Sequence, residues 1–167
     1  MNVAFFSESN FDRKIARDFD NMRTEYAWYV ALDAIHHHIN TLTKLEDNTY
    51  DLGIFIIPKT NIEQLMNFPL IEQMRRVCKK IGYMQEGPYW YFQDYSMEQQ
   101  VWFYNSLVSV DVIFAHNQSD VEYYKGLTNN KHVYQNKSLM IEDKIEPHIV
   151  NPDARDGVII GGNMVRW

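Results

Sequence analysis

Hydrophobic positions along the chain fall into two patterns, short continuous runs and stretches with an apolar residue every three or four positions. The short runs lie at 2–6, 50–57, 83–85, 111–115 and 132–135. Short apolar runs are typical of strands covered on both faces of a parallel sheet. The stretches between them favour helices with one apolar face. We therefore predict an α/β fold, a Rossmann-like βαβ three-layer sandwich with a mainly parallel sheet.

Periodicity and capping residues together predict the helices between these strands. We expect helices at 22–39, from Thr60 or Asn61 to Met66, and at 70–80, 97–108 and 121–127. Ser96 is a suitable cap for the fourth of these helices, and Ser119 or Asp120 for the fifth. A short strand near 39–45 is a weaker candidate.

The carboxyl ends of two predicted strands carry the first candidate site. Glu86 follows the strand at 83–85, and His116 and Asn117 follow the strand at 111–115. Ligands of parallel α/β sheets bind beyond such strand ends. Glu86 is a candidate general base or ligand for a sugar hydroxyl, because nearby aromatic rings raise the pKa of a carboxylate. A solvated or capping carboxylate is the alternative.

His116 and Asn117 are suited to orienting an acceptor or a phosphate at the start of the next helix. A capping role in the turn is the alternative. Gly87 and the aromatic run 88–92, which contains Trp90, form the adjoining loop. Such rings offer a platform for a flat or sugar-like ligand, and packing in the core or in a lid is the alternative.

The loop after the first strand is a second place where doubly wound folds contact ligands. Five polar residues flank it: Ser7, Glu8, Asn10, Arg23 and Thr24. Neither a Walker-type Gly-Lys-Ser/Thr nor a Gly-x-Gly-x-x-Gly pattern follows the strand, which argues against a nucleotide bound in the usual Rossmann or P-loop manner. A receiver domain is also excluded, because Asp51 begins its strand where an acceptor aspartate would end one.

Two further groups favour structure over chemistry. On the predicted helix, the consecutive residues His36, His37 and His38 point about 100° apart and cannot converge on one ion. We therefore predict no metal site there. Cys78 falls in the helix predicted at 70–80, where a buried filler role is favoured over that of a nucleophile.

Composition limits the remaining possibilities. The chain has 167 residues, 46% of them hydrophobic, which suits one full domain. The net charge of −6 gives no basic footprint for nucleic acid. A single cysteine fits a reducing compartment. The sequence enters a strand-like run directly after Met1, without a signal-peptide pattern, and its longest apolar run is too short to span a membrane. We expect a cytoplasmic protein.

Three segments together resemble glycosyltransferases of the GT-B type, which have two Rossmann-like domains. They are Tyr-Met-Gln-Glu-Gly-Pro at 83–88, Asp-Val-Ile-Phe-Ala-His-Asn at 111–117 and Gly-Val-Ile-Ile-Gly-Gly-Asn-Met at 157–164. The resemblance covers the layout of nearly the whole chain. It implies that residues 1–150 form an acceptor-binding domain. Residues 151–167 would then be a linker and the first strand of a second, donor-binding domain.

Carried over by position, the resemblance places 7–10 and 23–24 in the acceptor-side loop. Gly161 and Gly162 correspond to the turn near the donor diphosphate. Glu86 matches a cleft position where retaining members often have a histidine, so this chain departs from the pattern there. The implied activity is sugar transfer from a nucleotide-sugar to an acceptor once a donor domain completes the cleft, with the nucleotide-sugar as co-substrate and no other cofactor. The chain alone would have little activity.

The alternative is a non-catalytic α/β binding or protein-interaction module. Its exposed aromatic residues would serve a partner or self-association. The late segment 157–167 distinguishes the two hypotheses. If it adds a strand to the same sheet, the domain is complete; an orphan strand would favour the half-enzyme and dimerisation through an open edge.

Overall fold

The computed structural model describes residues 1–8, 13–14, 24–57, 62–87, 89–137 and 139. The expectations for 150–167 therefore lie outside the described residues. In chain order the elements are β1 (Val3–Ser7), β2 (Arg13–Lys14), α1 (Thr24–Ala31), β3 (Ile35–His38), η1 (Ile39–Lys44), β4 (Tyr50–Phe55), α2 (Ile62–Met66), α3 (Leu70–Val77), β5 (Cys78–Met84), η2 (Tyr89–Asp94), α4 (Met97–Val108), β6 (Val112–Ala115), α5 (Gln118–Thr128) and β7 (Val133–Gln135).

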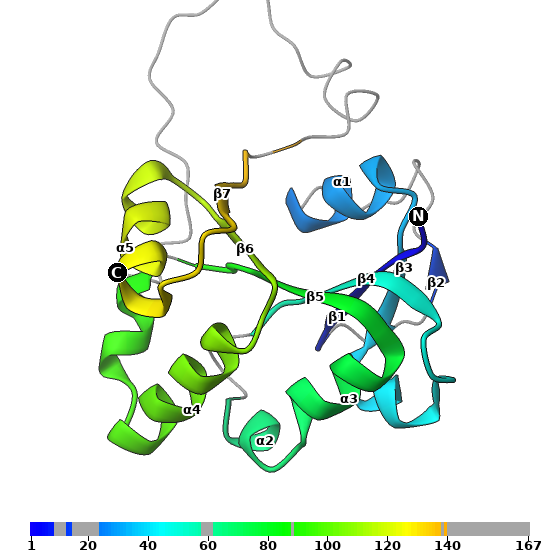
Figure 1. The fold of residues 1–167 in the computed structure, drawn as a ribbon, viewed down its shortest axis with the longest axis horizontal. Helices are drawn as coiled ribbons and strands as arrows, with labels where there is room; N and C mark the ends of the chain where they lie inside the picture. Colours follow the sequence, from blue (N-terminus) through cyan, green and yellow to red (C-terminus); the bar gives the residue numbers. More distant parts are fainter. Residues whose placement is uncertain (9–12, 15–23, 58–61, 88, 138, 140–167) are drawn as a thin grey trace, which may run out of the picture.

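The strands form one sheet in the order β2-β3-β1-β4-β5-β6-β7. Among the strands of the described residues, β3, β1, β4, β5, β6 and β7 are parallel, and β2 runs antiparallel to β3. Helices cover both faces of the sheet (Figure 1). The predicted fold class, a Rossmann-like three-layer sandwich with a mainly parallel sheet, is confirmed.

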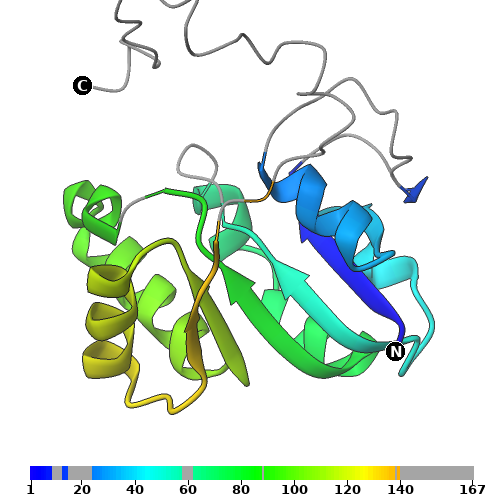
Figure 2. The ribbon, with the colours of Figure 1, turned by 90° about the horizontal axis from the view of Figure 1, so that it is seen from above.

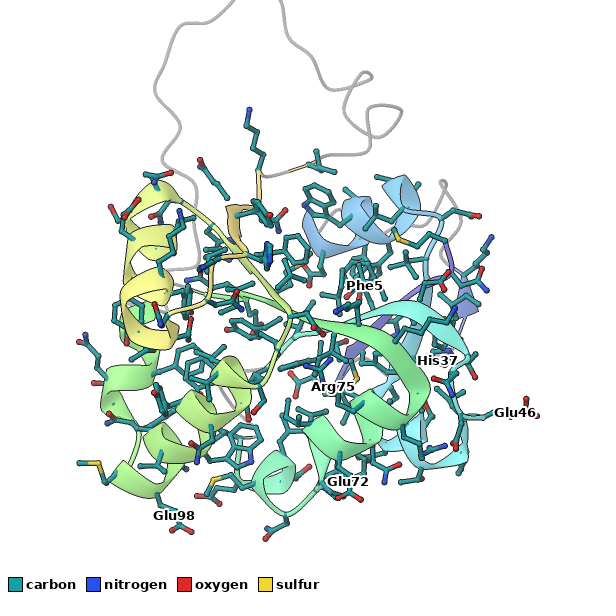
Figure 3. The ribbon with its side chains drawn as sticks, in the orientation of Figure 1. Phe5, His37, Glu46, Glu72, Arg75 and Glu98 are labelled. Carbon is teal, nitrogen blue, oxygen red and sulfur yellow. The ribbon has the colours of Figure 1, made fainter. Side chains whose placement is uncertain are left out.

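The two faces of the sheet are covered unequally. The first crossover, β1–α1–β3, runs in one direction along the sheet, and the crossovers from β4 to β7 run in the other. Right-handed crossovers in opposite directions place their helices on opposite faces. Among the described helices, α1 is therefore the one that packs on the small core, which includes Phe5 and Tyr29. Phe5 lies beneath α1 (Figure 3). The larger core lies on the other face with η1, α2, α3, α4 and α5. α1 lies over the β1 side, and α5 lies beside β7 (Figure 2).

The helix predicted at 22–39 is wrong in its second half. α1 ends at Ala31, and Asp33 adopts a left-handed conformation with φ 50° before the chain enters β3. The amide of Ala34 still donates to Tyr29 O at 2.9 Å, which closes the turn. The apolar spacing of this segment also fits a strand that pairs with β1 on one side and β2 on the other. The candidate strand at 39–45 is instead the 3₁₀-helix η1.

The helix predicted at 70–80 is three residues too long. α3 ends at Val77, and Cys78 begins β5, paired with Tyr50. Cys78 is therefore on a strand, contrary to the prediction, but it is buried as expected of a filler residue. Burial raises the pKa of its thiol to about 12, which disfavours the thiolate that a nucleophile needs.

The predictions for the second half of the chain agree more closely with the structure. α4 spans 97–108 as predicted, and Ser96 caps it in a capping box with Gln99. β6 and β7 also lie where they were expected. The cap predicted for α5 is wrong. Asn117, not Ser119 or Asp120, caps this helix, which begins three residues earlier than predicted.

Candidate functional site

The carboxyl ends of β5 and β6 bring Glu86 and His116 into contact. These strands are adjacent and parallel, with Met84 opposite Phe114 in the register. His116 Nε2 lies 3.0 Å from the backbone oxygen of Glu86. A carbonyl oxygen only accepts, so Nε2 must carry the proton and Nδ1 of the neutral ring is an acceptor. Within the described residues no partner is found for Nδ1, and the ring is half-exposed.

A buried polar pair holds this edge in place. Gln85 Nε2 donates to Asp120 Oδ2 at 2.8 Å, and Gln85 Oε1 accepts from the backbone N–H of His116 at 3.0 Å. Both side chains are buried. Gln85 thus joins the end of β5 to the turn after β6 and to the first turn of α5. This arrangement fixes the position of His116 more firmly than the turn alone would.

The predicted site residue Asn117 caps α5. Its Oδ1 accepts from the backbone N–H of Asp120 at 2.9 Å, although the side chain as a whole is exposed. The first turn of α5 begins directly beside His116, and the partial positive charge of a helix N-terminus favours negative groups there. The capping alternative for Asn117 therefore describes its observed contact.

The negative charge of Glu86 acts on the hydroxyls of two tyrosines, Tyr95 and Tyr83. Burial raises the pKa of Tyr95 to about 12, and the negative charge of Glu86 adds to the effect. The pKa of Tyr83 is also raised, mainly by burial and then by neighbours that include Tyr124 and Glu86. A half-buried carboxylate is thus present at the strand end where the sequence placed a candidate base.

The aromatic loop after Glu86 contributes at least one ring to the core. Phe92 in η2 is buried and stacks on Phe103 of α4, with ring centroids 3.9 Å apart. For this ring, core packing is the observed role. Gly87 lies half-buried in the bend before η2, and Trp90 lies within η2, but the side chain of Trp90 is outside the described part of the structure.

The chain after β7 runs along the same edge. The amide of Asn136 donates to Ala115 O at 2.6 Å. Next in sequence, Lys137 O accepts from Trp28 Nε1 of α1 at 3.1 Å. This backbone therefore crosses from the β7 side towards α1 and forms a border of the carboxyl edge.

The second candidate region lies at the end of β1, where the topological switch point falls between β1 and β4. Ser7 Oγ lies 2.7 Å from His36 Nε2, a distance that also suits a nucleophile and its base. His36 is fully buried and stacks on Tyr29, however, so the contact joins β1 to β3 inside the fold. Glu8 is exposed just beyond β1. Asn10, Arg23 and the side chain of Thr24 lie outside the described residues, as do Gly161 and Gly162.

The three consecutive histidines do not share one environment. They lie on β3 rather than on a helix, so the helical geometry assumed in the sequence analysis is wrong. His37 Nε2 contacts Tyr50 Oη at 2.6 Å, and His38 Nδ1 accepts from the Asn40 amide at 3.1 Å. Neighbouring strand residues point to opposite faces. Among the described residues, no group of three or more His, Cys, Asp or Glu side chains is placed to hold a metal ion.

Sequence reasoning located the edge but missed Gln85 and Asp120 as its supports. A polar residue at the end of the strand predicted at 83–85, after two apolar residues, was the available signal for Gln85. Comparisons of the chain with protein-family models, curated proteins and solved structures gave no match. Within the described ranges, no helix is long and apolar enough to cross a bilayer.

Proposed function

We propose that the carboxyl edge of β5 and β6 binds the acceptor of a sugar-transfer reaction. On this proposal, sugar passes from a nucleotide-sugar to that acceptor when a donor-binding domain completes the cleft. The observation that carries the proposal is the juxtaposition of Glu86 and His116, in which Nε2 of the ring donates to the Glu86 carbonyl and Nδ1 has no partner among the described residues. The resemblance of 83–88 and 111–117 to GT-B glycosyltransferases supports the choice of a sugar ligand.

The chemistry of these groups suits a hydroxyl-rich ligand. A sugar hydroxyl donates one hydrogen bond and accepts others. The Nδ1 of neutral His116 is an acceptor for such a hydroxyl, and the Glu86 carboxylate is a second acceptor or a base. Strands lie about 4.8 Å apart, so the end of β1 is about 10 Å from the end of β5. A ligand the size of a disaccharide would span from Glu86 to Glu8.

The second candidate is a non-catalytic module that binds another protein. The observation in its favour is a group of exposed apolar side chains on α4. Under this alternative, the polar groups of the edge would serve the fold only.

Calorimetric titration tests the proposal with a panel of mono- and disaccharides, nucleoside diphosphates and nucleotide-sugars. We expect at least one saccharide to bind, and its affinity to fall about tenfold or more in Glu86→Gln and in His116→Ala, because each removes one acceptor at the edge. Lys79→Ala is the matched control, since Lys79 lies on the same strand at the opposite edge. Its affinity should not change.

Three outcomes would contradict the proposal. Saccharide binding that both edge variants leave unchanged would place the ligand elsewhere. Tight binding of a nucleotide-sugar by this chain alone would make it the donor side, and the assignment of halves would be wrong. Binding of no ligand, by this chain or by a longer product of the same reading frame, would favour the interaction module.

A further inference from the structure

α4 exposes a row of four apolar side chains to solvent. The exposed fractions are 75% for Met97, 50% for Val101, 41% for Tyr104 and 42% for Val108. Their spacing of four, three and four residues places them on one face of the helix, as in the seam of a coiled coil. Phe103, Ser106 and Leu107 are buried on the core side. The row, which we call the α4 seam, is therefore additional to the face that packs in the core.

The charge of α4 is unusual for a solvent-facing helix. Such helices normally have charged residues on the outer face. In α4 the only charged residue is Glu98, although 23% of the whole chain is charged. Glu98 lies at the start of the helix and points away from the fold (Figure 3). The rest of the outer face is neutral, so a second copy of this acidic chain can approach it without like-charge repulsion along the seam.

The spacing of the seam is the same in both directions along the helix. Two copies of α4 packed antiparallel about a two-fold axis would place Met97 opposite Val108 of the second copy. Val101 would lie opposite Tyr104 in the same way. An isologous two-fold contact requires this kind of self-complementarity. A parallel pair would instead bring the two Glu98 carboxylates together and align the two helix dipoles unfavourably.

We propose that the chain forms a homodimer through antiparallel packing of α4 against α4 of a second copy. α4 has 12 residues and is therefore about 18 Å long. A contact of this length lies at the small end of specific interfaces. The dimer is accordingly weak and depends on protein concentration.

Sedimentation velocity over about 1 to 300 µM protein, a range that brackets a micromolar dissociation constant, tests the dimer. We expect the sedimentation coefficient to rise from the monomer value towards the dimer value. Val101→Glu should raise the dissociation constant about tenfold or more, because it buries a carboxylate against an apolar side chain. Circular dichroism should show that this variant folds, since Val101 is half-exposed.

Tyr134→Glu is the matched control for Val101→Glu. Tyr134 is 53% exposed on β7. It pairs in register with Phe114, which packs with the α1-side core, so it lies on the face of the sheet opposite to α4. Association that is lost equally in both variants would overturn the assignment to α4. A monomer at every concentration would overturn the dimer.

Cysteine cross-linking tests the register. The only native cysteine, Cys78, is buried, so an introduced thiol is the reactive one. A mixture of Met97→Cys and Val108→Cys chains should form a mixed disulfide, while Met97→Cys alone should not, because its thiols would lie about 16 Å apart in the antiparallel pair. Linking of Met97→Cys alone would indicate a parallel pair. A monomer whose Met97→Cys thiol resists alkylation would indicate another occupant of the seam. Either result would overturn the proposal.

Discussion

The sheet has an amino edge, where its parallel strands begin, and a carboxyl edge, where they end. These two edges use polar residues in different ways. At the amino edge, charges of opposite sign pair with one another: Lys79 lies 2.7 Å from Asp51, and Asp111 bonds to both Arg75 and Lys80. At the carboxyl edge, Gln85 and Asp120 form one buried pair, and His116 keeps one ring nitrogen without a partner among the described residues. An edge whose charges neutralise one another has little left for a ligand. We propose that the carboxyl edge keeps binding capacity at His116, which is why we place the site there.

The difference also appears in the titration of Asp111. Partial burial works against ionisation of this carboxyl, but hydrogen bonds from the Ile81 amide, Arg75 and Lys80 outweigh it, so its pKa lies below the usual value. The amino edge is therefore built to keep a carboxylate ionised. This is a structural use of charge that holds α3, β5 and β6 together.

The largest effect is expected from breaking the buried pair of the carboxyl edge. Asp120→Ala leaves the Gln85 amide buried without its acceptor, and we expect a loss of about 2–3 kcal/mol in the free energy of unfolding. Urea denaturation measures this change. Gln118→Ala, at an exposed position in the same first turn, is the control and should change stability by less than about 0.5 kcal/mol. Equal effects of the two substitutions would show that the buried pair does not hold the edge.

A smaller loss is expected at the amino edge. Asp111→Asn removes the charge that Arg75 and Lys80 neutralise, and we expect it to cost about 1–2 kcal/mol at pH 7. Because the folded pKa of Asp111 is lowered, its contribution is fully present above the unfolded value of about 4 and is lost as the pH falls through the folded pKa. Urea denaturation at a series of pH values should show the two proteins converging in acid.

Asp47→Asn is the control for this experiment. Asp47 also pairs with an arginine, Arg76 at 2.6 Å, but its own side chain is 68% exposed, so solvent screens the interaction. We expect its effect to be smaller than that of Asp111→Asn and to depend more on salt. A stability difference for Asp111→Asn that stays constant down to the lowest pH would contradict the electrostatic explanation.

The sequence was sufficient to predict the elements whose local signals agree with their final environment. α4 has a cap, a capping box and helical periodicity, and both of its predicted ends match the structure. Near Ile35 the same kind of periodicity led to a wrong prediction of helix. Pairing with β1 and β2 decides the conformation of 35–38, and the spacing of apolar residues does not reveal that pairing. At Cys78 the strand begins without a turn after α3, so no breaker residue marks the change.

In the candidate site, too, residues placed by local signals could be predicted, whereas residues placed by long-range contacts could not. Glu86 and His116 were predictable at strand ends, because the apolar runs before them fix where the strands stop. Gln85 and Asp120 were not, since their contact joins residues 35 positions apart and depends on how α5 packs against β6. Ser7, after the first strand, was predicted to bind a ligand. The structure shows its hydroxyl in contact with His36 of the neighbouring strand, a contact that the sequence alone does not reveal.

The smallest effect, and the finest test of the comparison, comes from one chemical change made at both edges. Tyr50 opens β4 at the amino edge, and its hydroxyl contacts His37 Nε2 at 2.6 Å. Tyr83 lies just before the carboxyl end of β5, and its hydroxyl, like that of Tyr124, is buried without a hydrogen-bond partner of suitable geometry among the described residues. The hydroxyls of Tyr50 and Tyr83 must both lose their water on folding, but of these two only the hydroxyl of Tyr50 regains a hydrogen bond.

We expect Tyr50→Phe to lower the free energy of unfolding by about 1 kcal/mol. Tyr83→Phe should leave it unchanged or raise it by about 0.5 kcal/mol, because it removes a buried polar group that makes no bond. Urea denaturation of the two variants side by side measures the difference, and the shared loss of one hydroxyl makes each the control for the other. Equal destabilisation would mean that the hydroxyls of Tyr83 and Tyr124, which lie close enough to perturb each other's pKa, share a hydrogen bond in solution. Both tyrosine hydroxyls would then be satisfied alike, and the contrast between the edges would rest on the ion pairs of one edge and on the Gln85–Asp120 pair and His116 of the other.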